Sequence, residues 1–236
     1  MPGLLRQPPG GDTGRRPPLW LLLTFVVCGT LSLHILVPAL PAMAVDLGVS
    51  DGSIQLALTV YVLSLAGGQL VYGPLSDRYG RRPVLLVGLL LYTLGGFAAA
   101  AAPNLPLLLA ARVLQAAGGC SGLVLGRAVI RDTSSPPEAA SRLALLNMCM
   151  SVAPALASIA GGALVVHVGW RSIFLLLAVA GVGSLAAALL ILPETNPALG
   201  QRSVGLLRAN VRLLRMPTFL GYAIPGAMAT TTFYGF

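Results

Sequence analysis

The chain has 236 residues, of which 56% are apolar and only 9% are charged, whereas a typical soluble domain carries about 25% charged residues. This composition excludes an ordinary soluble enzyme or binding domain and indicates helices embedded in lipid. The net charge of +8 reflects 15 basic residues, all arginine, against seven acids, and nearly all of the arginines flank apolar runs. We therefore interpret the charge as membrane topology and expect no nucleic-acid partner.

The amino-terminal part combines a polar tail with a long apolar run. Residues 1–18 are rich in proline, glycine and arginine and are predicted to form a disordered cytoplasmic tail. The run 19–45 is longer than the apolar part of a signal peptide, about 7–15 residues, although Ala42-Met43-Ala44 resembles a cleavage site. We therefore predict a first membrane helix that Pro38 and Pro41 bend or end near the outer surface.

Five further runs are long enough for helices that cross a hydrocarbon core of about 30 Å. The sequence predicts these helices at 54–72, 84–102, 107–126, 143–166 and 173–192, which completes a six-helix bundle over 19–192. A central cytoplasmic loop is expected at 193–217, where 204–214 alternates apolar and basic residues as a membrane-surface helix does. The run 218–236 is expected to begin a seventh helix. Cys28, Cys120 and Cys149 fall inside apolar runs and are predicted to be packing residues.

Arginines are distributed unequally between the two sides of this predicted bundle. The tail and the links after the second, fourth and sixth helices contain nearly all of them, whereas the opposite side holds only Arg171. Because arginine is enriched in cytoplasmic segments, the amino terminus and the link 73–83 are expected to be cytoplasmic.

The link 73–83 reads Gly-Pro-Leu-Ser-Asp-Arg-Tyr-Gly-Arg-Arg-Pro. Gly73 and Pro74 are expected to end the second helix, Gly80 to allow a sharp reversal, and Pro83 to begin the third helix. In one interpretation the arginines only anchor this link at the cytoplasmic surface. That interpretation explains neither the single carboxylate at Asp77 nor the flanking glycines.

This link resembles the G-x-L-x-D-R-x-G-R-R loop of the major facilitator superfamily of transporters. The resemblance implies a loop that bridges the two halves of a transporter and holds one of its conformations. The residues that match this conformational-switch loop are Gly73, Asp77, Arg78, Gly80, Arg81 and Arg82.

Arg112 is the one charged residue deep in a predicted span. A charge at mid-membrane costs roughly 2.5–3.5 kcal/mol on insertion scales and is normally functional or paired. The alternative is snorkelling, because Leu107 at the outer end of this helix is only about five residues, or one and a half turns, away. The stretch Arg112–Asp132 resembles the R-x-x-Q-x-x-G…G-R-A-x-x-R-D pattern of Bcr/CflA-type drug:proton antiporters, which implies a role for Arg112 in proton coupling.

The fifth predicted helix carries a second pattern of this subfamily. Pro154, Gly161 and Gly162 match A-P-x-x-[AG]-P-x-x-G-G, although Ser158 replaces the second proline. Ordinary packing of small residues between helices is the alternative explanation.

The stretch 31–41 aligns with L-S-x-D-M-Y-L-P-A-L-P, where the subfamily has a helix 1 carboxylate and this chain has His34. Histidine titrates near neutral pH, so one hypothesis makes His34 the proton carrier, with Arg112 shifting its proton affinity. In the other hypothesis His34 only forms hydrogen bonds within the cavity. Gln115, Tyr61 and Asn147 are polar residues in spans that line the substrate cavity of this fold, which makes them candidate substrate contacts.

The resemblance implies an all-α, polytopic membrane helix bundle, namely the amino-terminal six-helix half of a major facilitator fold plus part of helix 7. It implies proton-coupled multidrug efflux across the bacterial inner membrane by alternating access, with drug-like substrates, protons and the bilayer as partners and no cofactor, metal or covalent catalysis. A missing carboxy-terminal half of the same protein is the other expected partner. The alternatives are a truncated, transport-inactive half and a major facilitator that imports a nutrient.

Overall fold

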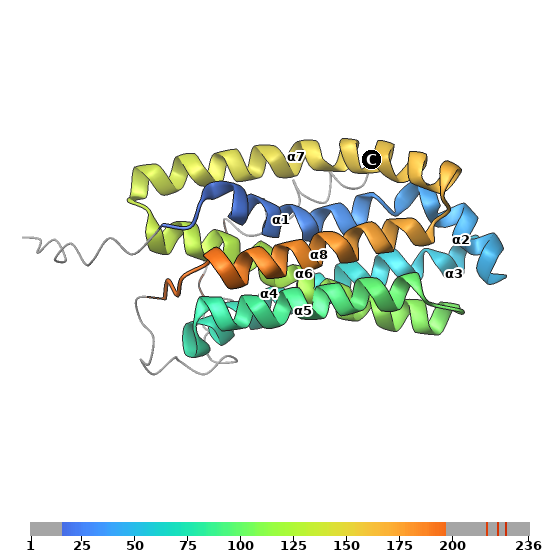
Figure 1. The fold of residues 1–236 in the computed structure, drawn as a ribbon, viewed down its shortest axis with the longest axis horizontal. Coiled ribbons are helices and arrows are strands. Elements are labelled where there is room, and N and C mark those ends of the chain that lie inside the picture. Colours follow the sequence, from blue (N-terminus) through green and yellow to red (C-terminus); the bar gives the residue numbers. More distant parts are fainter. Residues whose placement is uncertain (1–15, 197–215, 217–220, 222–224, 226–236) are drawn as a thin grey trace, which may run out of the picture. The chain divides into compact units, whose positions relative to one another are not determined.

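The computed structural model describes residues 16–196 together with Met216, Gly221 and Pro225, and all regular structure in the described part is helical (Figure 1). The predicted all-α fold is therefore confirmed. Most of the expected tail 1–18, most of the central loop 193–217, its surface helix 204–214 and nearly all of the seventh helix at 218–236 lie outside the described residues.

Six membrane-length helical segments are present in the described part, as the sequence predicts. They are built from α1 (Leu19–His34), the short 3-10 helix η1 (Val37–Ala39), α2 (Leu40–Leu47), α3 (Asp51–Ile54), α4 (Leu56–Tyr79), α5 (Arg81–Ala100), α6 (Leu105–Thr133), α7 (Pro136–His167) and α8 (Arg171–Ile191). The first span consists of α1, η1 and α2, and the second consists of α3 and α4.

The first span changes its helical geometry at the two predicted prolines. The α-helix ends at His34, η1 contains Pro38, and α2 contains Pro41 near its start. Because Pro38 has no N–H group, it cannot donate to the carbonyl of His34 one turn earlier. The hydroxyl of Ser158 on α7 donates to that carbonyl over 3.4 Å.

The second span does not end where the sequence predicts. Helix α4 continues through Gly73 and Pro74 to Tyr79, so the prediction that these two residues end the helix is wrong. Proline removes one backbone hydrogen bond, whereas leaving the helix inside an apolar medium would expose several backbone groups. The reversal follows at Gly80, whose φ of 101° confirms the need for glycine there.

Three other helix boundaries also differ from their predicted positions. Helix α5 starts at Arg81, so Pro83 is its third residue rather than its first. Helix α6 continues to Thr133 and α7 begins at Pro136, because polar residues are compatible with a helix once it has left the hydrocarbon region. Arg127, Arg131 and Asp132 are therefore helical residues and not part of a link.

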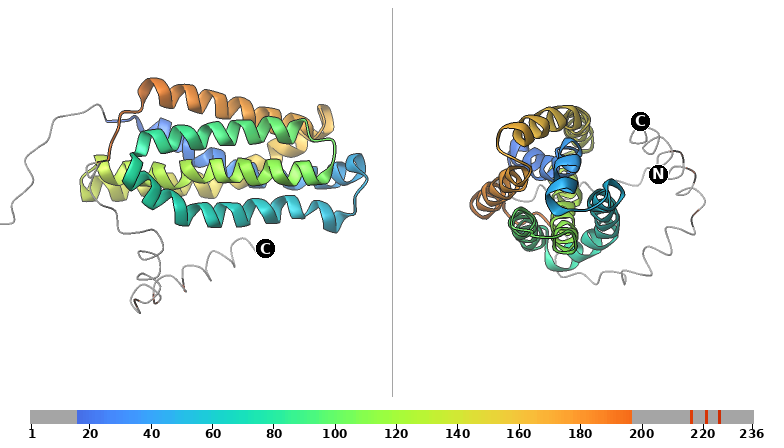
Figure 2. Two further views of the ribbon diagram at one scale, coloured as in Figure 1. Left: turned by 90° about the horizontal axis from the view of Figure 1, so that it is seen from below. Right: turned by 90° about the vertical axis from the view of Figure 1, so that its right-hand side faces the viewer.

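Helix α6 is the centre of the bundle and packs against α1, α4 and α5 (Figure 2). Glycines allow this close approach: a Cβ at Gly118 would clash with the backbone of Tyr92 on α5, and one at Gly122 with the carbonyl of Phe25 on α1. Helix α8 packs on α5, and α7 packs on α1 and η1. Many apolar side chains of α4 and α7 are exposed, as expected for surfaces whose solvent is lipid or another apolar bundle.

Candidate functional site

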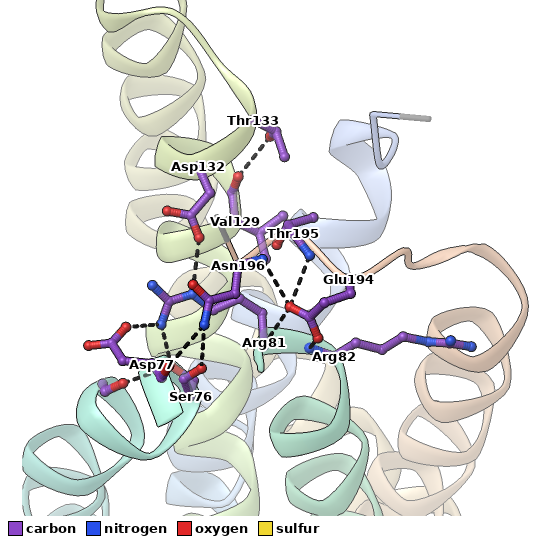
Figure 3. Close-up of polar contacts among 11 residues, drawn as sticks. Ser76, Asp77, Arg81, Arg82, Val129, Asp132, Thr133, Glu194, Thr195 and Asn196 are labelled. Carbon is purple, nitrogen blue, oxygen red and sulfur yellow. Dashed lines mark hydrogen bonds and ion pairs between the residues drawn. The ribbon is translucent and has the colours of Figure 1, made fainter. Parts of the chain in front are cut away.

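Polar side chains gather at two places that the sequence singled out. The Arg81 network lies at the end of the bundle where α4 meets α5 and consists of Ser76, Asp77, Arg81, Asp132, Glu194 and Asn196 (Figure 3). The Arg112 cluster lies inside the bundle and consists of Ser32, Tyr61, Tyr92, Arg112 and Gln115.

The guanidinium group of Arg81 connects three helices (Figure 3). Its Nη1 forms an ion pair with Asp77 and donates to the hydroxyl of Ser76, both on α4. Its Nε donates to Asp132 Oδ2 on α6 over 3.0 Å. The loop and the end of α6 are thus fixed to one another by one planar donor group, which suits arginine better than lysine.

Glu194 caps the start of α5. Its Oε1 accepts a hydrogen bond from the backbone N–H of Arg81 at 2.9 Å, and its Oε2 accepts one from the N–H of Arg82 at 3.1 Å. A carboxylate is stabilised at a helix N-terminus because the first N–H groups lack helical partners. Asn196 Nδ2 donates to the carbonyls of Ser76 and Asp77 at the end of α4. The segment after α8 therefore holds both sides of the α4–α5 turn.

Sequence reasoning gave Glu194 and Asn196 no part in the loop. The available signal was the Leu192-Pro-Glu-Thr195 stretch directly after an apolar helix, but its capping partner lies more than 100 residues away in the chain. The other loop arginines have different contacts. Arg82 Nη2 donates to the carbonyl of Leu189 on α8. The guanidinium carbon of the exposed Arg78 lies 5.2 Å from the centre of the Tyr79 ring.

Replacing Asp132 with asparagine is expected to weaken the bundle more than the same change at Asp77. The side chain of Asp132 is only 16% exposed, whereas that of Asp77 is 52% exposed and its ion pair is screened by water. We expect a loss of about 1–3 kcal/mol in the free energy of unfolding for Asp132→Asn and below about 1 kcal/mol for Asp77→Asn. Thermal unfolding of the detergent-solubilised protein measures both, with Arg81→Ala as the reference variant. A larger loss for Asp77→Asn would contradict this ranking.

The guanidinium group of Arg112 on α6 is fully buried, so the snorkelling alternative does not describe this structure. Its Nε donates to the carbonyl of Ala57 on α4 at 3.3 Å. Its Nη2 donates to the carbonyl of Ser32 on α1 at 3.1 Å, and its Nη1 donates to Gln115 Oε1 at 2.8 Å. The ring of Tyr61 lies 3.9 Å from the guanidinium carbon, within cation–π range. All these contacts are with neutral groups.

Two tyrosines fix the part of α1 that contacts Arg112. The hydroxyl of Tyr61 donates to the carbonyl of Gly29 over 2.7 Å. The hydroxyl of Tyr92 on α5 lies 2.7 Å from the Ser32 hydroxyl and donates to the carbonyl of Cys28. Sequence reasoning missed Ser32 and Tyr92, although a tyrosine in mid-span signals a polar group that needs a partner.

The three predicted cavity residues do not lie together. Tyr61 and Gln115 are fully buried beside Arg112, whereas Asn147 is exposed on α7. Their contact with a substrate stays a prediction.

His34 is the last residue of α1 and is half-buried, two positions beyond the carbonyl that Arg112 binds. The glycines of the α7 pattern pack against the same region. A Cβ at Gly161 would clash with the carbonyl of Ile35, and one at Gly162 would touch Pro38. The α7 pattern that includes Pro154 thus contributes close packing of α7 on the proline-containing part of the first span.

The end of the bundle opposite the Arg81 network has its own ion pair. Asp46 Oδ2 accepts hydrogen bonds from Arg171 Nη1 at 2.6 Å and from Trp170 Nε1 at 3.1 Å. Charged groups thus occupy both ends of the described bundle, and Arg112 is the charged residue buried in its interior. The described residues contain no group of three histidine, cysteine or acidic side chains that would hold a metal ion.

The chain is similar to a family of membrane transporters and to several of its curated members. The model of the Major Facilitator Superfamily matches residues 20–236. The chain is 35% identical over 94% of its length to the uncharacterized MFS-type transporter YdgK of Bacillus subtilis, covering 56% of that protein. It is 37% identical to Multidrug resistance protein D of Escherichia coli, over 76% of the chain and 45% of that protein. It is 36% identical to a Chloramphenicol resistance protein of Pseudomonas aeruginosa, over 79% of the chain and 44% of that protein.

Solved structures with low sequence identity share the fold. The human organic anion transporter MFSD10 matches with a TM-score of 0.60 and 22% identity, over 85% of this chain and 51% of that one. A peptide transporter, POT, bound to alafosfalin matches with a TM-score of 0.67 and 16% identity, over 92% of this chain and 46% of that one. The chain spans about half the length of the curated relatives it matches.

Proposed function

This chain belongs to the major facilitator superfamily, and from that premise we propose that it supplies the amino-terminal bundle of a proton-coupled exporter of drug-like molecules of the Bcr/CflA type. Relatives named for multidrug and chloramphenicol resistance support the drug-like substrate class. In such a carrier the substrate binds near the bilayer midplane between two bundles, which rock against each other to alternate access.

The observation that carries the proposal is the fully buried Arg112, held by neutral groups from α1, α4 and α6. A buried charge in a membrane span is expensive, so its burial inside the bundle favours a role in the transport cycle over a role in packing. His34 is the nearby titratable group on α1, which makes it our candidate proton carrier.

The Arg81 network is the proposed conformational switch. Its contacts join α4, α5, α6 and the segment after α8 at one end of the bundle, which supports a role in coupling the movements of these spans. In our proposal Gly73 and Gly80 belong to this loop, which closes against the second bundle in one state of the carrier.

Transport itself is the first test. The protein is expressed from its complete reading frame in an Escherichia coli strain that lacks its own drug exporters. We expect lower accumulation of chloramphenicol, with the difference lost when a protonophore collapses the proton gradient. A properly inserted protein that changes the accumulation of no compound in a small drug panel would contradict export. Increased uptake of a nutrient would instead favour an importer.

Replacing His34 with alanine is expected to uncouple transport from protons. In proteoliposomes, substrate-driven proton flux through the wild-type protein should fall at least tenfold in His34→Ala, while substrate binding persists. His167→Ala is the matched control, because this histidine is exposed at the end of α7. Unchanged proton flux in His34→Ala would leave His34 with only a hydrogen-bonding role.

The proposed location is the bacterial inner membrane, with the amino terminus and the Arg81 network in the cytoplasm. Arg78→Cys and His167→Cys, each in a variant without native cysteines, report the two ends of the bundle because both residues are exposed. We expect an impermeant maleimide to label His167→Cys in intact cells and Arg78→Cys only after permeabilisation. Labelling of both from the same side would contradict the topology.

A further inference from the structure

The interior of the described bundle contains a positive charge but no acid. The six acids among the described residues all lie at or beyond the ends of spans; they are Asp46, Asp51, Asp77, Asp132, Glu138 and Glu194. Arg112 is the charged residue of the interior, and His34 on α1 carries either no charge or a positive one. The electrostatic environment that this bundle presents to a ligand is therefore neutral to positive.

The Arg112 cluster also has more hydrogen-bond donors than acceptors. The guanidinium group has five N–H groups and uses three of them for the carbonyls of Ser32 and Ala57 and for Gln115 Oε1. Because Gln115 Oε1 faces Arg112, its Nε2 is directed elsewhere. That Nε2 is buried and has no hydrogen-bond partner among the described residues. A buried donor without a partner is costly, so an acceptor supplied by a ligand would be stabilised there.

The aromatic face that a cationic drug would need is already occupied. The ring centre of Tyr61 lies 3.9 Å from the guanidinium carbon of Arg112, and that of Phe174 lies 5.8 Å from it. A cation arriving here would meet Arg112 without a counter-charge in a medium of low dielectric constant, where repulsion is strong.

Building on the proposed function, we propose that Arg112 and Gln115 form a subsite for a hydrogen-bond acceptor of the substrate. The exporter then takes uncharged or anionic compounds that carry such acceptors and rejects permanent cations. The carbonyls of Ser32 on α1 and Ala57 on α4 occupy two guanidinium positions in this structure, at 3.1 and 3.3 Å. When α1 and α4 move apart, the acceptor of the substrate replaces one of these carbonyls.

The experiment compares an uncharged probe, chloramphenicol, with a permanent cation, tetraphenylphosphonium. Equilibrium dialysis with the detergent-solubilised protein measures binding, and proteoliposomes measure transport. We expect the wild-type protein to bind tetraphenylphosphonium at least tenfold more weakly than chloramphenicol. Gln115→Glu replaces the buried donor with a carboxylate of the same size and should tighten binding of the cation at least tenfold while weakening binding of chloramphenicol.

Two further variants keep the result interpretable. His34→Asp introduces a carboxylate at a second position near the cluster and should also admit the cation if Gln115→Glu fails to fold. Gln55→Glu makes the same chemical change at an exposed position at the start of α4 and should change neither affinity.

Wild-type binding of tetraphenylphosphonium as tight as that of chloramphenicol would overturn the proposed charge preference, as would failure to bind either probe. A lack of gain in both acidic variants would overturn it as well. Binding with the expected preference but without transport of chloramphenicol would contradict the export function and leave the subsite supported.

Discussion

Replacing Arg112 with leucine is expected to abolish transport while the protein still folds and inserts. The change leaves Gln115 Oε1 without the donor at Arg112, at a cost of about 1–3 kcal/mol, whereas the carbonyls of Ser32 and Ala57 each lose one of two possible donors. The same change removes a buried cation, and exchanging buried charges for apolar groups is often neutral or stabilising. Stability should therefore change little, although the charge needed for the transport cycle is gone.

Drug accumulation in cells and thermal unfolding of the purified protein together check this expectation. Arg112→Lys is the informative second variant, since a point charge on a flexible stem cannot reach acceptors on α1, α4 and α6 at once. We expect it to lose at least tenfold in transport despite keeping the charge. Full export by Arg112→Leu would show that the buried guanidinium is structural. Failure of that variant to fold would show that the bundle needs the charge for its packing.

Replacing Gly118 with alanine is expected to produce one of the largest losses of stability in the bundle. The new methyl group would overlap the backbone of Tyr92 and the carbonyl of Gly88, neither of which can move like a side chain. Overpacking typically lowers the free energy of unfolding by about 1–3 kcal/mol. We expect a loss of about 3 kcal/mol or more here, because a clash with a neighbouring backbone forces α5 and α6 apart. In lipid, close packing is a main source of helix association, so the loss has no compensation.

The matched control is Gly183→Ala, where a Cβ would meet no atom within 4 Å. This variant should be as stable as the wild-type protein or slightly more so, because alanine has the higher helix propensity. Thermal unfolding in detergent, followed by size-exclusion chromatography of the remaining folded protein, measures both variants. Equal melting temperatures for the two would contradict the close α5–α6 contact.

Composition and run length were sufficient to predict the six spans, because a hydrocarbon core dictates both helix length and apolar content. They were insufficient for the helix ends. Pro74 in a soluble protein would be a strong stop signal, yet α4 continues past it since helix is the backbone state that lipid tolerates. The sequence pattern places charged residues such as Arg131 in a link although they are helical, because polarity marks the membrane boundary and not the end of a helix.

The residues of the candidate site were likewise predictable only in part. Arg112 stood out because one charge in an apolar span is conspicuous, and Gly80 because the reversal requires its backbone conformation. The roles of Glu194 and Tyr92 could not be predicted, because their partners come from distant parts of the chain. No local sequence pattern indicates which helices become neighbours. Pairing of spans depends on three-dimensional packing, which here is determined largely by the glycines of α6.

The hydroxyl of Ser158 has a consequence for how the first span can bend. Pro38 leaves the backbone one donor short at the carbonyl of His34, and the serine of a different helix supplies the missing donor. A proline at position 158 has no hydroxyl and could not donate this hydrogen bond. Bending of the first span at its prolines is therefore linked to the position of α7, because that helix contributes both this hydroxyl and the close contact at Gly161.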